Sequence, residues 1–186
     1  LMRGADNMII HTASGKAINV GDMSYYAPRS EYTHHGAEYL LYLNGATGEP
    51  YGWDGSSDGF TPMAFPLPRF EVGEAANVLN ATDSEYAKVW GDADTGHRSL
   101  KIYMGAPYLD GRHASIFLGR GCYTRHKMCA LDVDPATHKL TQRWRWNCYD
   151  SGSAWFGNGF HNFAIADVDM DGRDEIMFGS MCIDDT

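Results

Sequence analysis

Several features that mark common protein classes are missing from this 186-residue sequence. No apolar run approaches the ~20 residues that a membrane-spanning helix needs. Positive charge is scarce, with 15 Lys+Arg against 24 Asp+Glu and a formal net charge of −9. The chain therefore has no basic stripe with which to neutralise phosphates. We expect neither a membrane-spanning segment nor a nucleic-acid partner.

The cysteines lack the spacings of metal or redox motifs. They form no C-x-x-C pair and no zinc pattern. Buried free thiols fit such an arrangement, and a disulfide is the alternative if the protein is exported. The four cysteines are Cys122, Cys129, Cys148 and Cys182.

A signal peptide is also missing, but both ends of the chain look cut. The chain opens on Leu1 and ends at Asp184-Asp185-Thr186, directly after a strand-like run. We therefore expect a fragment truncated at both ends, whose targeting segments lie outside this chain.

Long helical periodicity is hard to find, and short apolar runs alternate with turn residues instead. Aromatic residues make up 13% of the chain, and 21 glycines punctuate it. Many short strands at regular spacing predict an all-β fold, that is, a sandwich, a barrel or a propeller. The predicted strands are Glu38–Leu43, Leu100–Met104, Ser115–Gly119, Met128–Val133, Thr141–Trp146 and Glu175–Phe178.

Two internal repeats favour the β-propeller among these folds. "LNGATGEP" (43–50) recurs loosely as "VDPATHKL" (133–140), 90 residues later. That offset equals about two propeller blades of ~40–45 residues. "DGRHASIFLG" (110–119) and "DGRDEIMFG" (171–179) share Asp-Gly-Arg before an apolar strand. Chance similarity of turn motifs is the alternative. We predict that residues 1–186 form roughly four blades of one propeller domain.

An acidic loop, "IADVDMDGRDEIMFGS" (165–180), has the spacing of a calcium site. Three aspartates take positions 1, 3 and 5, a glycine follows for the sharp turn, a carbonyl comes at position 7 and a glutamate at position 9. Calcium prefers six to eight oxygen ligands, which such a loop can wrap around one point. An EF-hand is excluded because Phe178 occupies position 12. The alternative is a solvated acidic turn. The expected ligands are Asp167, Asp169, Asp171, Arg173 and Glu175.

The earlier Asp-Gly-Arg loop has lost most of these acids. Aligned on the shared motif, it carries Ala106 and Tyr108 where the first two aspartates stand, and only Asp110 remains. We expect this loop to keep the turn without the cation. The pattern indicates a metal that braces a blade hairpin.

The residues around the acidic loop also resemble a known family. "FGNGFHNFAIADVDMDGRDEIMFGSMCIDD" (156–185) resembles the Gly-x-Gly-x-His-Asn…Ala-Asp-Val-Asp-x-Asp-Gly-x-Asp-Glu-Ile stretch of rhamnogalacturonan lyases of polysaccharide lyase family 11. Three further stretches resemble the family in the same order, and "GKAINVGD" (15–22) is a weaker match. They are "GAEYLLYLNGATGEP" (36–50), "VWGDADTGHRSLKIYMGAPYLDGRHASIFLGRGCYTR" (89–125) and "LTQRWRWN" (140–147). Two positions depart from the family pattern, at Phe160 and Met170.

The resemblance implies an eight-bladed propeller with calcium-binding blade loops that cleaves the rhamnogalacturonan I backbone of pectin by β-elimination. A basic side chain would take the C5 proton of galacturonate, while a calcium ion at the active centre neutralises the adjacent carboxylate as a Lewis acid. The family's later blades carry much of its catalytic apparatus and are absent here. We therefore expect this fragment to be inactive alone, and the parent to be a monomer that is secreted, periplasmic or on the cell surface.

The resemblance assigns His161 to the active-centre cluster, with an ordinary loop histidine as the alternative. The catalytic base is not identified. Arg120 and Arg125 are candidates for binding the carboxylates of the substrate. Their alternative role is structural, as an arginine pair that ties blades together through hydrogen bonds to carbonyls. The expected substrate-binding residues are Arg120, Tyr123, Thr124, Arg125 and Asn162.

Two further patterns receive a structural interpretation. Trp144 and Trp146 alternate with Arg143 and Arg145, which predicts tryptophans toward the core and arginines toward solvent. The glycine-rich "DSGSAWFGNGF" (150–160) lacks the spacing of a phosphate-binding loop. A second function also stays open, that of a non-catalytic calcium-braced propeller module for carbohydrate or protein binding.

Overall fold

The computed structural model describes most of the chain and divides it into two compact units, Leu1–Thr82 and Asp83–Thr186. The predictions at Phe160 and in most of 150–160 lie outside the described residues. The described residues are 7–22, 28–29, 32–33, 38–55, 60, 62–78, 81–91, 97–150, 156–158 and 161–185.

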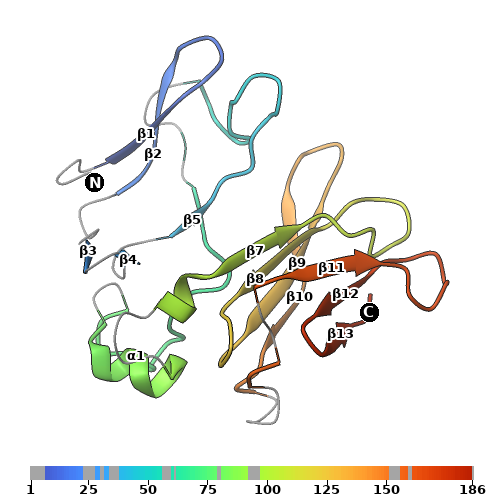
Figure 1. Cartoon of the computed structure of the whole chain (residues 1–186). Coiled ribbons are helices and arrows are strands. Elements are labelled where there is room, and N and C mark those ends of the chain that lie inside the picture. Colours follow the sequence, from blue (N-terminus) through green and yellow to red (C-terminus); the bar gives the residue numbers. More distant parts are fainter. Residues whose placement is uncertain are drawn as a thin grey trace. The chain divides into compact units, whose positions relative to one another are not determined.

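The first unit contains three short antiparallel strand pairs (Figure 1). The longest pair is a hairpin whose register shifts between Met8 and Ile9. Its turn is held by Thr12, whose Oγ1 accepts a hydrogen bond from the backbone amide of Lys16 at 3.1 Å. The pairs are β1 (Asn7–His11) with β2 (Ala17–Asp22), β3 (Pro28–Arg29) with β4 (Tyr32–Thr33), and β5 (Tyr39–Leu40) with β6 (Met63–Ala64).

The two turns at 43–50 and 133–140 have the same hydrogen bonds. The side-chain oxygen of Asn44 accepts from the amides two and three residues later, and that of Asp134 does the same. Four residues after this Asx side chain φ is positive in both turns, 71° at Gly48 and 56° at His138. The repeat seen in the sequence is therefore a repeat of turn geometry, set by Asn44 and Asp134.

The second unit opens with helix α1 (Asp83–Trp90), which the sequence analysis did not predict. Thr82-Asp83-Ser84-Glu85 has the spacing of a capping box, and Lys88 lies in the last turn, where a positive charge is favourable. The helix buries Tyr86, Val89 and Trp90. The 3₁₀-helix η1 (His97–Leu100) follows. Among the described residues, no helix is long and apolar enough to cross a membrane.

Two antiparallel sheets make up the rest of this unit (Figure 1). Both follow chain order, as in the sheets of an up-and-down meander, and β12 begins and ends at the predicted residues. The prediction of an all-β fold of short strands is confirmed, the sheets are antiparallel, and α1 is an addition to this β fold. The first sheet contains β7 (Ile102–Gly105), β8 (Ile116–Arg120), β9 (Lys127–Val133) and β10 (Leu140–Asn147); the second contains β11 (Phe163–Ala166), β12 (Glu175–Phe178) and β13 (Met181–Ile183).

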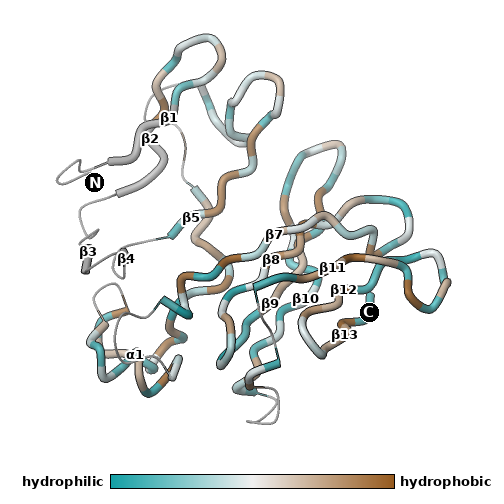
Figure 2. The backbone as a smooth tube through the Cα atoms, viewed as in Figure 1, coloured by the Kyte–Doolittle hydropathy of each residue, from teal (hydrophilic) through white to brown (hydrophobic). Residues whose placement is uncertain are grey.

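One hydrophobic cluster joins the two sheets. Tyr103 of the first sheet packs edge-on against Phe178 of the second, with ring centroids 4.9 Å apart. Strand β13 is apolar along its length (Figure 2) and contributes Met181 and Ile183 to the cluster. Trp144 and Trp146 also pack against the cluster, as their alternation predicted. The buried members are Tyr103, Leu109, Phe117, Met128, Ala130, Ile176, Phe178 and Met181.

The four cysteines are free thiols. Three of them are buried as expected, whereas Cys182 is exposed because its side chain alternates with the core-facing residues of β13. Within the described part of the chain no sheet closes on itself. The propeller, and the count of four blades, stay predictions.

Candidate functional site

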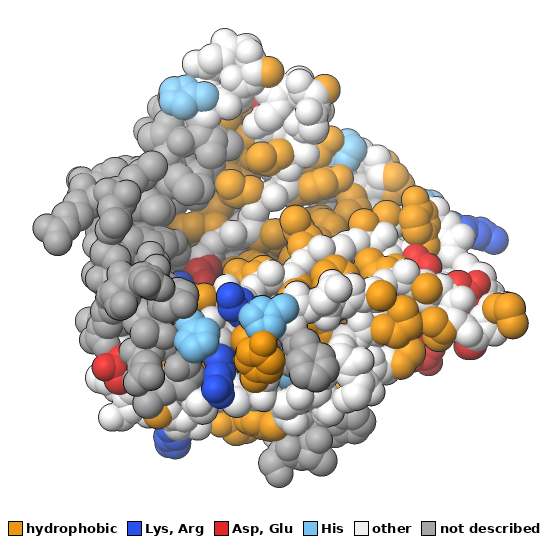
Figure 3. Space-filling view, viewed as in Figure 1, with side chains coloured by type: hydrophobic (Ala, Val, Ile, Leu, Met, Phe, Trp, Pro, Cys, Tyr) orange, Lys and Arg blue, Asp and Glu red, His pale blue; other side chains and the backbone are white. Residues whose placement is uncertain are grey.

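The acidic loop connects β11 to β12 and closes where Ala166 pairs with Glu175. Its first aspartate, Asp167, accepts hydrogen bonds from the backbone amides of Asp171 at 3.1 Å and Gly172 at 3.0 Å. Gly172 has a φ of 94°, which a side chain would disfavour. On the face in Figure 3, acidic side chains gather at the tip of this loop, at the right of the view. The carboxylates thus organise the loop through its own amides.

Three carboxylates of this loop converge on one point. Oxygens of Asp167, Asp169 and Glu175 lie within 4.8 Å of one another. Two ligands of the same calcium ion, each ~2.3–2.6 Å from it, can be at most about 5 Å apart. Asp171 is not a member of this group, and its Oδ1 accepts from the Arg173 amide at 2.9 Å.

Glu175 supplies the strongest indication that a cation fits here. It is 3% exposed, and its Oε2 accepts from the Val168 amide at 2.7 Å. Its Oε1 is buried without a hydrogen-bond partner. A buried carboxylate oxygen without a donor is costly, and a bound cation would offset that cost. The all-oxygen donor set suits calcium.

The earlier loop keeps the turn of the acidic loop, as predicted. Asp110 Oδ1 accepts from the Arg112 amide at 2.7 Å, the same turn hydrogen bond that Asp171 makes. Hydrogen bonds from the amide of His113, then from its ring and from the Arg112 amide, hold the pKa of Asp110 well below its usual range. Here the protein's own donors surround the carboxylate. Whether this loop has also lost the cation stays a prediction.

The two Asp-Gly-Arg loops pack against each other. The Tyr108 amide donates to Asp174 Oδ2 at 2.7 Å, and the Asp174 amide donates to the Tyr108 carbonyl at 3.2 Å. A Cβ at Gly111 would lie 2.6 Å from the carbonyl oxygen of Gly172. Such a short approach is possible only without a side chain at Gly111.

Tyr123 and His161 form an exposed pair away from the acidic loops. Their ring centroids are 5.0 Å apart, in an edge-on arrangement. Tyr123 is 44% exposed and has a φ of 61°, a strained conformation for a bulky residue that is common at functional sites. Asn162 is also exposed, and its Oδ1 accepts from the Phe163 amide at 3.0 Å. The structure thus brings together two residues that lie 38 positions apart in the sequence.

Thr124, the residue after Tyr123, is half-buried. Its Oγ1 donates to the Trp90 carbonyl at 2.6 Å. A Cβ placed on Gly91 would lie 3.2 Å from the Thr124 methyl and 3.8 Å from Arg98 Nη1. Arg98 therefore lies close to Thr124, a neighbour that the sequence analysis missed because "GHRSLK" carries no motif of its own.

Arg120 and Arg125 are buried, at 1% and 0% exposure. Arg120 Nη1 donates to the Ser99 carbonyl, and Arg125 Nε donates to Asn147 Oδ1 at 3.1 Å. The Arg125 guanidinium also lies over the Tyr149 ring, 4.2 Å from its centroid. These are the contacts of arginines that hold elements together, the alternative left open by the sequence. Their role in substrate binding stays a prediction, and we leave both out of the site proposed below.

Comparison with known proteins assigns the family. The family model of rhamnogalacturonan lyase family 11, C-terminal domain, matches residues 71–186, more than half of the chain. The chain belongs to rhamnogalacturonan lyase family 11. The resemblance seen in the sequence is therefore confirmed, and the acidic loop and the Tyr123–His161 pair both lie in the matched part of this family 11 chain.

Curated relatives of this family 11 chain come from Bacillus subtilis (strain 168). Rhamnogalacturonan exolyase YesX is 31% identical over 175 residues, which cover 93% of the chain and 24% of YesX. Rhamnogalacturonan endolyase YesW is 42% identical over 96 residues, which cover 51% of the chain and 15% of YesW. The chain thus spans at most about a quarter of the length of these relatives.

Solved structures resemble this family 11 chain along most of its length. The crystal structure of the exotype lyase YesX matches with a TM-score of 0.70 and 30% identity, over 94% of the chain and 24% of YesX. The crystal structure of YesW matches with a TM-score of 0.67 and 30% identity, over 94% of the chain and 25% of YesW. The Bacillus licheniformis rhamnogalacturonan lyase PL11 matches with a TM-score of 0.69 and 28% identity, over 94% of the chain and 25% of that lyase.

Proposed function

We propose that the chain is part of a longer polysaccharide lyase that cleaves rhamnogalacturonan I at rhamnose–galacturonate bonds by β-elimination. Membership of rhamnogalacturonan lyase family 11 carries this proposal. Because such an enzyme meets pectin outside the cell, we propose that the protein is exported.

The Tyr123–His161 pair is the part of the described surface that we assign to the substrate. An exposed phenol ring can stack on a sugar face, and imidazole commonly serves in general acid–base chemistry. In the elimination, a base takes the C5 proton of galacturonate. The C5–H electron pair then forms the C4=C5 double bond, and the C4–O bond breaks as the leaving sugar departs. Thr124 follows Tyr123 in the chain, and Asn162 follows His161. Arg98 lies close to Thr124. We assign these three residues to positioning the substrate.

Neither group of metal-capable side chains in the described residues contains His161, so we propose no cation ligand at the Tyr123–His161 pair. The proposed calcium of Asp167, Asp169 and Glu175 has another role. Bound there, calcium would balance three carboxylates and brace the β11–β12 hairpin.

The architecture that best fits these elements is a propeller. Two successive meanders pack face to face through one apolar cluster, and the turn geometry repeats 90 residues apart. Stacked, repeated sheets of this kind are the building units of propeller folds.

We predict that the full-length protein carrying this chain produces unsaturated uronides from rhamnogalacturonan I, seen as a rise in ultraviolet absorbance. Tyr123→Ala should lower kcat/KM by about two- to tenfold because a stacking contact is worth ~0.5–1.5 kcal/mol. His161→Ala should lower it by ~10²–10⁴ if imidazole takes part in proton transfer. Tyr123→Phe, which keeps the ring, should retain most activity.

Tyr108→Ala is the matched control, because Tyr108 is 50% exposed and lies outside the pair. Loss of activity in this control equal to that of Tyr123→Ala would remove the site assignment. Binding of the polysaccharide without any unsaturated product would instead favour the non-catalytic module.

A further inference from the structure

We propose that Ser180 is a positioning residue for the Tyr123–His161 pair. It lies in the turn between β12 and β13. Its hydrogen bonds to Asn158 hold the segment 156–158, which contacts the turn that carries Tyr123 and precedes His161 in the chain. This inference rests on the proposed function of the pair and extends it to a residue of the second sheet.

Tyr123 is the central residue of a tight, strained turn. The Thr124 amide donates to the Cys122 carbonyl at 2.7 Å, and Tyr123 between them has a φ of 61°. A hydrogen bond from residue i+2 to residue i around a positive φ is the pattern of the positive-φ form of the γ-turn, which is rare and strained. Such a conformation persists only where neighbouring groups hold it, so the groups that hold this turn also set where the phenol ring lies.

Two segments of the chain hold this turn through Thr124. The Thr124 hydroxyl donates to the Trp90 carbonyl at 2.6 Å, and the Gly157 amide donates to the Thr124 carbonyl at 3.1 Å. A Cβ on Gly157 would lie 3.3 Å from the Tyr123 carbonyl oxygen, so the two backbones approach each other closely. The segment 156–158 therefore helps to keep Tyr123 in its strained conformation.

Ser180 in turn holds the segment 156–158. The Ser180 amide donates to the Asn158 carbonyl at 3.1 Å, and the Ser180 hydroxyl donates to Asn158 Oδ1 at 2.8 Å. At the other end of the segment, the Phe156 ring packs edge-on against Tyr149, with centroids 5.2 Å apart. Two hydrogen bonds between the same two residues fix the orientation of Asn158 as well as its position, because backbone and side chain are both held.

The anchored segment is connected to both members of the pair. Gly157 binds the turn of Tyr123, and His161 follows Asn158 by three residues in the chain. The two rings lie 5.0 Å apart, and a substrate that meets both depends on that spacing. A misplacement of about 1 Å can lower a rate by ~10²-fold. Ser180 therefore acts on the reaction through the placement of the pair.

Ser180→Ala tests this role in the full-length protein that carries the chain. The change removes the side-chain hydrogen bond and keeps the backbone one. We expect kcat/KM on rhamnogalacturonan I to fall about two- to tenfold, which corresponds to the loss of one hydrogen bond. Ser180→Thr, which keeps the hydroxyl, should restore the native value. In the Tyr123→Ala background, where the pair is already broken, Ser180→Ala should lower kcat/KM by a smaller factor; equal factors in the two backgrounds would overturn the proposal.

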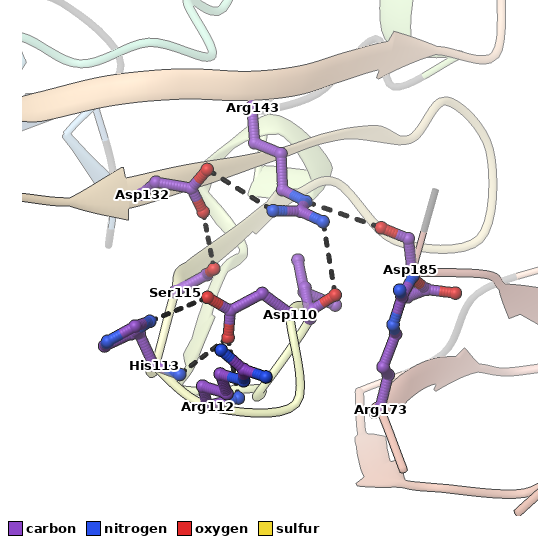
Figure 4. A network of polar contacts seen from close by, with 9 residues as sticks. Asp110, Arg112, His113, Ser115, Asp132, Arg143, Arg173 and Asp185 are labelled. Carbon is purple, nitrogen blue, oxygen red and sulfur yellow. Dashed lines mark hydrogen bonds and ion pairs between the residues drawn. The ribbon is translucent and has the colours of Figure 1, made fainter. Parts of the chain in front are cut away.

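Ser115→Ala is the matched control. The Ser115 hydroxyl donates to Asp132 Oδ1 at 2.7 Å, in the polar network around Arg143 (Figure 4). The control thus removes a serine hydrogen bond of the same kind, outside the pair and the segments that hold it, and should leave kcat/KM at the native value. An equal loss of kcat/KM in Ser115→Ala and Ser180→Ala would show a general effect of a missing hydrogen bond and would overturn the positioning role.

A second measurement reports the pair without using activity. In the NMR spectrum of the full-length protein with isotopically labelled histidine, the Tyr123 ring shifts the His161 ring signals, which His161→Gln identifies. Ser180→Ala should move these signals toward their positions in Tyr123→Ala, and Ser115→Ala should not. Unmoved signals in Ser180→Ala would overturn the positioning role, as would a native kcat/KM in Ser180→Ala beside a lowered one in Tyr123→Ala. Moved signals with a native kcat/KM in both variants would instead overturn the proposed function of the pair.

Discussion

At the scale of single residues, Gly121 shows how closely the buried turn after β8 is packed. It has a φ of 100°. A Cβ on it would overlap the Arg125 carbonyl oxygen and would lie 2.7 Å from the Trp90 ring. No L side chain fits there without moving backbone.

We expect Gly121→Ala to lower the free energy of unfolding by more than about 3 kcal/mol, because the backbone strain of an L residue at positive φ adds to the overpacking. Gly73→Ala is the control. Gly73 has a φ of 86°, and a Cβ added to it would meet nothing within 4 Å, so it should show the strain alone, about 1–2 kcal/mol. Urea unfolding measures both. Equal losses would mean that the close contact is unimportant.

His126 is a buried residue with a consequence for pH dependence. Burial lowers its pKa from 6.5 to about 4, and a contact with the Gly121 carbonyl opposes this only in part. Its ring packs against Phe178, with centroids 5.3 Å apart. In the unfolded chain this histidine takes up a proton near its ordinary pKa, whereas in the folded protein it stays neutral.

The stability due to neutral His126 is therefore fully present above pH 6.5 and is lost as the pH falls from 6.5 toward 4. At one pKa unit per ~1.4 kcal/mol, the loss amounts to about 3 kcal/mol. His126→Gln should flatten the dependence of the unfolding free energy on pH between these values. The control His11→Gln, at an exposed histidine, should leave this pH dependence as it is in the native protein. If His126→Gln also left it unchanged, buried His126 would not be its source.

At the scale of elements, the two Asp-Gly-Arg loops follow the same turn but stabilise it differently. In the 106–115 loop, His113 Nδ1 lies 2.8 Å from Asp110 Oδ2. In the 167–174 loop, three carboxylates converge, and Asp167 and Glu175 accept hydrogen bonds from uncharged backbone amides. In one loop the protein's own donors therefore hold the carboxylate, and the other loop is suited to a cation.

We expect calcium to raise the Tm of the native chain and not that of Asp169→Asn. A ligand at 100 times its Kd adds about 2.7 kcal/mol, which is worth several degrees in a domain of this size. Differential scanning calorimetry with and without a chelator measures the effect, and Asp150→Asn, at an exposed aspartate outside the loop, should behave as the native chain does. An identical Tm with and without chelator in the native chain would rule out a stabilising metal.

At the scale of the whole molecule, the Asp83–Thr186 unit depends on one core shared by two sheets. Phe178 of β12 contacts Tyr103 of β7 and His126 beside β9. A change on one sheet should therefore be felt on the other, because side chains of both sheets belong to the same apolar cluster.

Phe178→Ala should cost about 3–5 kcal/mol and should speed amide hydrogen exchange in β7–β10 as well as in β11–β13. Val168→Ala, at a residue 51% exposed in the loop, should change neither. Faster exchange confined to β11–β13 would show that the two sheets open independently.

Much of the fold and part of the site were predictable because they depend on short-range patterns. Glu175–Phe178 is bounded by turn residues and matches its predicted strand. The Trp144/Trp146 alternation placed both rings on the core face. Helix α1 was missed because it is only eight residues long, although its capping-box spacing was present in the sequence.

The sequence by itself determined which turns form, where short strands lie and which loop carries convergent acids, because each follows from residues a few positions apart. Only the tertiary structure decided that Arg120 and Arg125 are buried, since η1 and β10 supply their partners. It also placed Tyr123 beside His161. Strand register and sheet packing bring these distant segments together, and no local pattern encodes either.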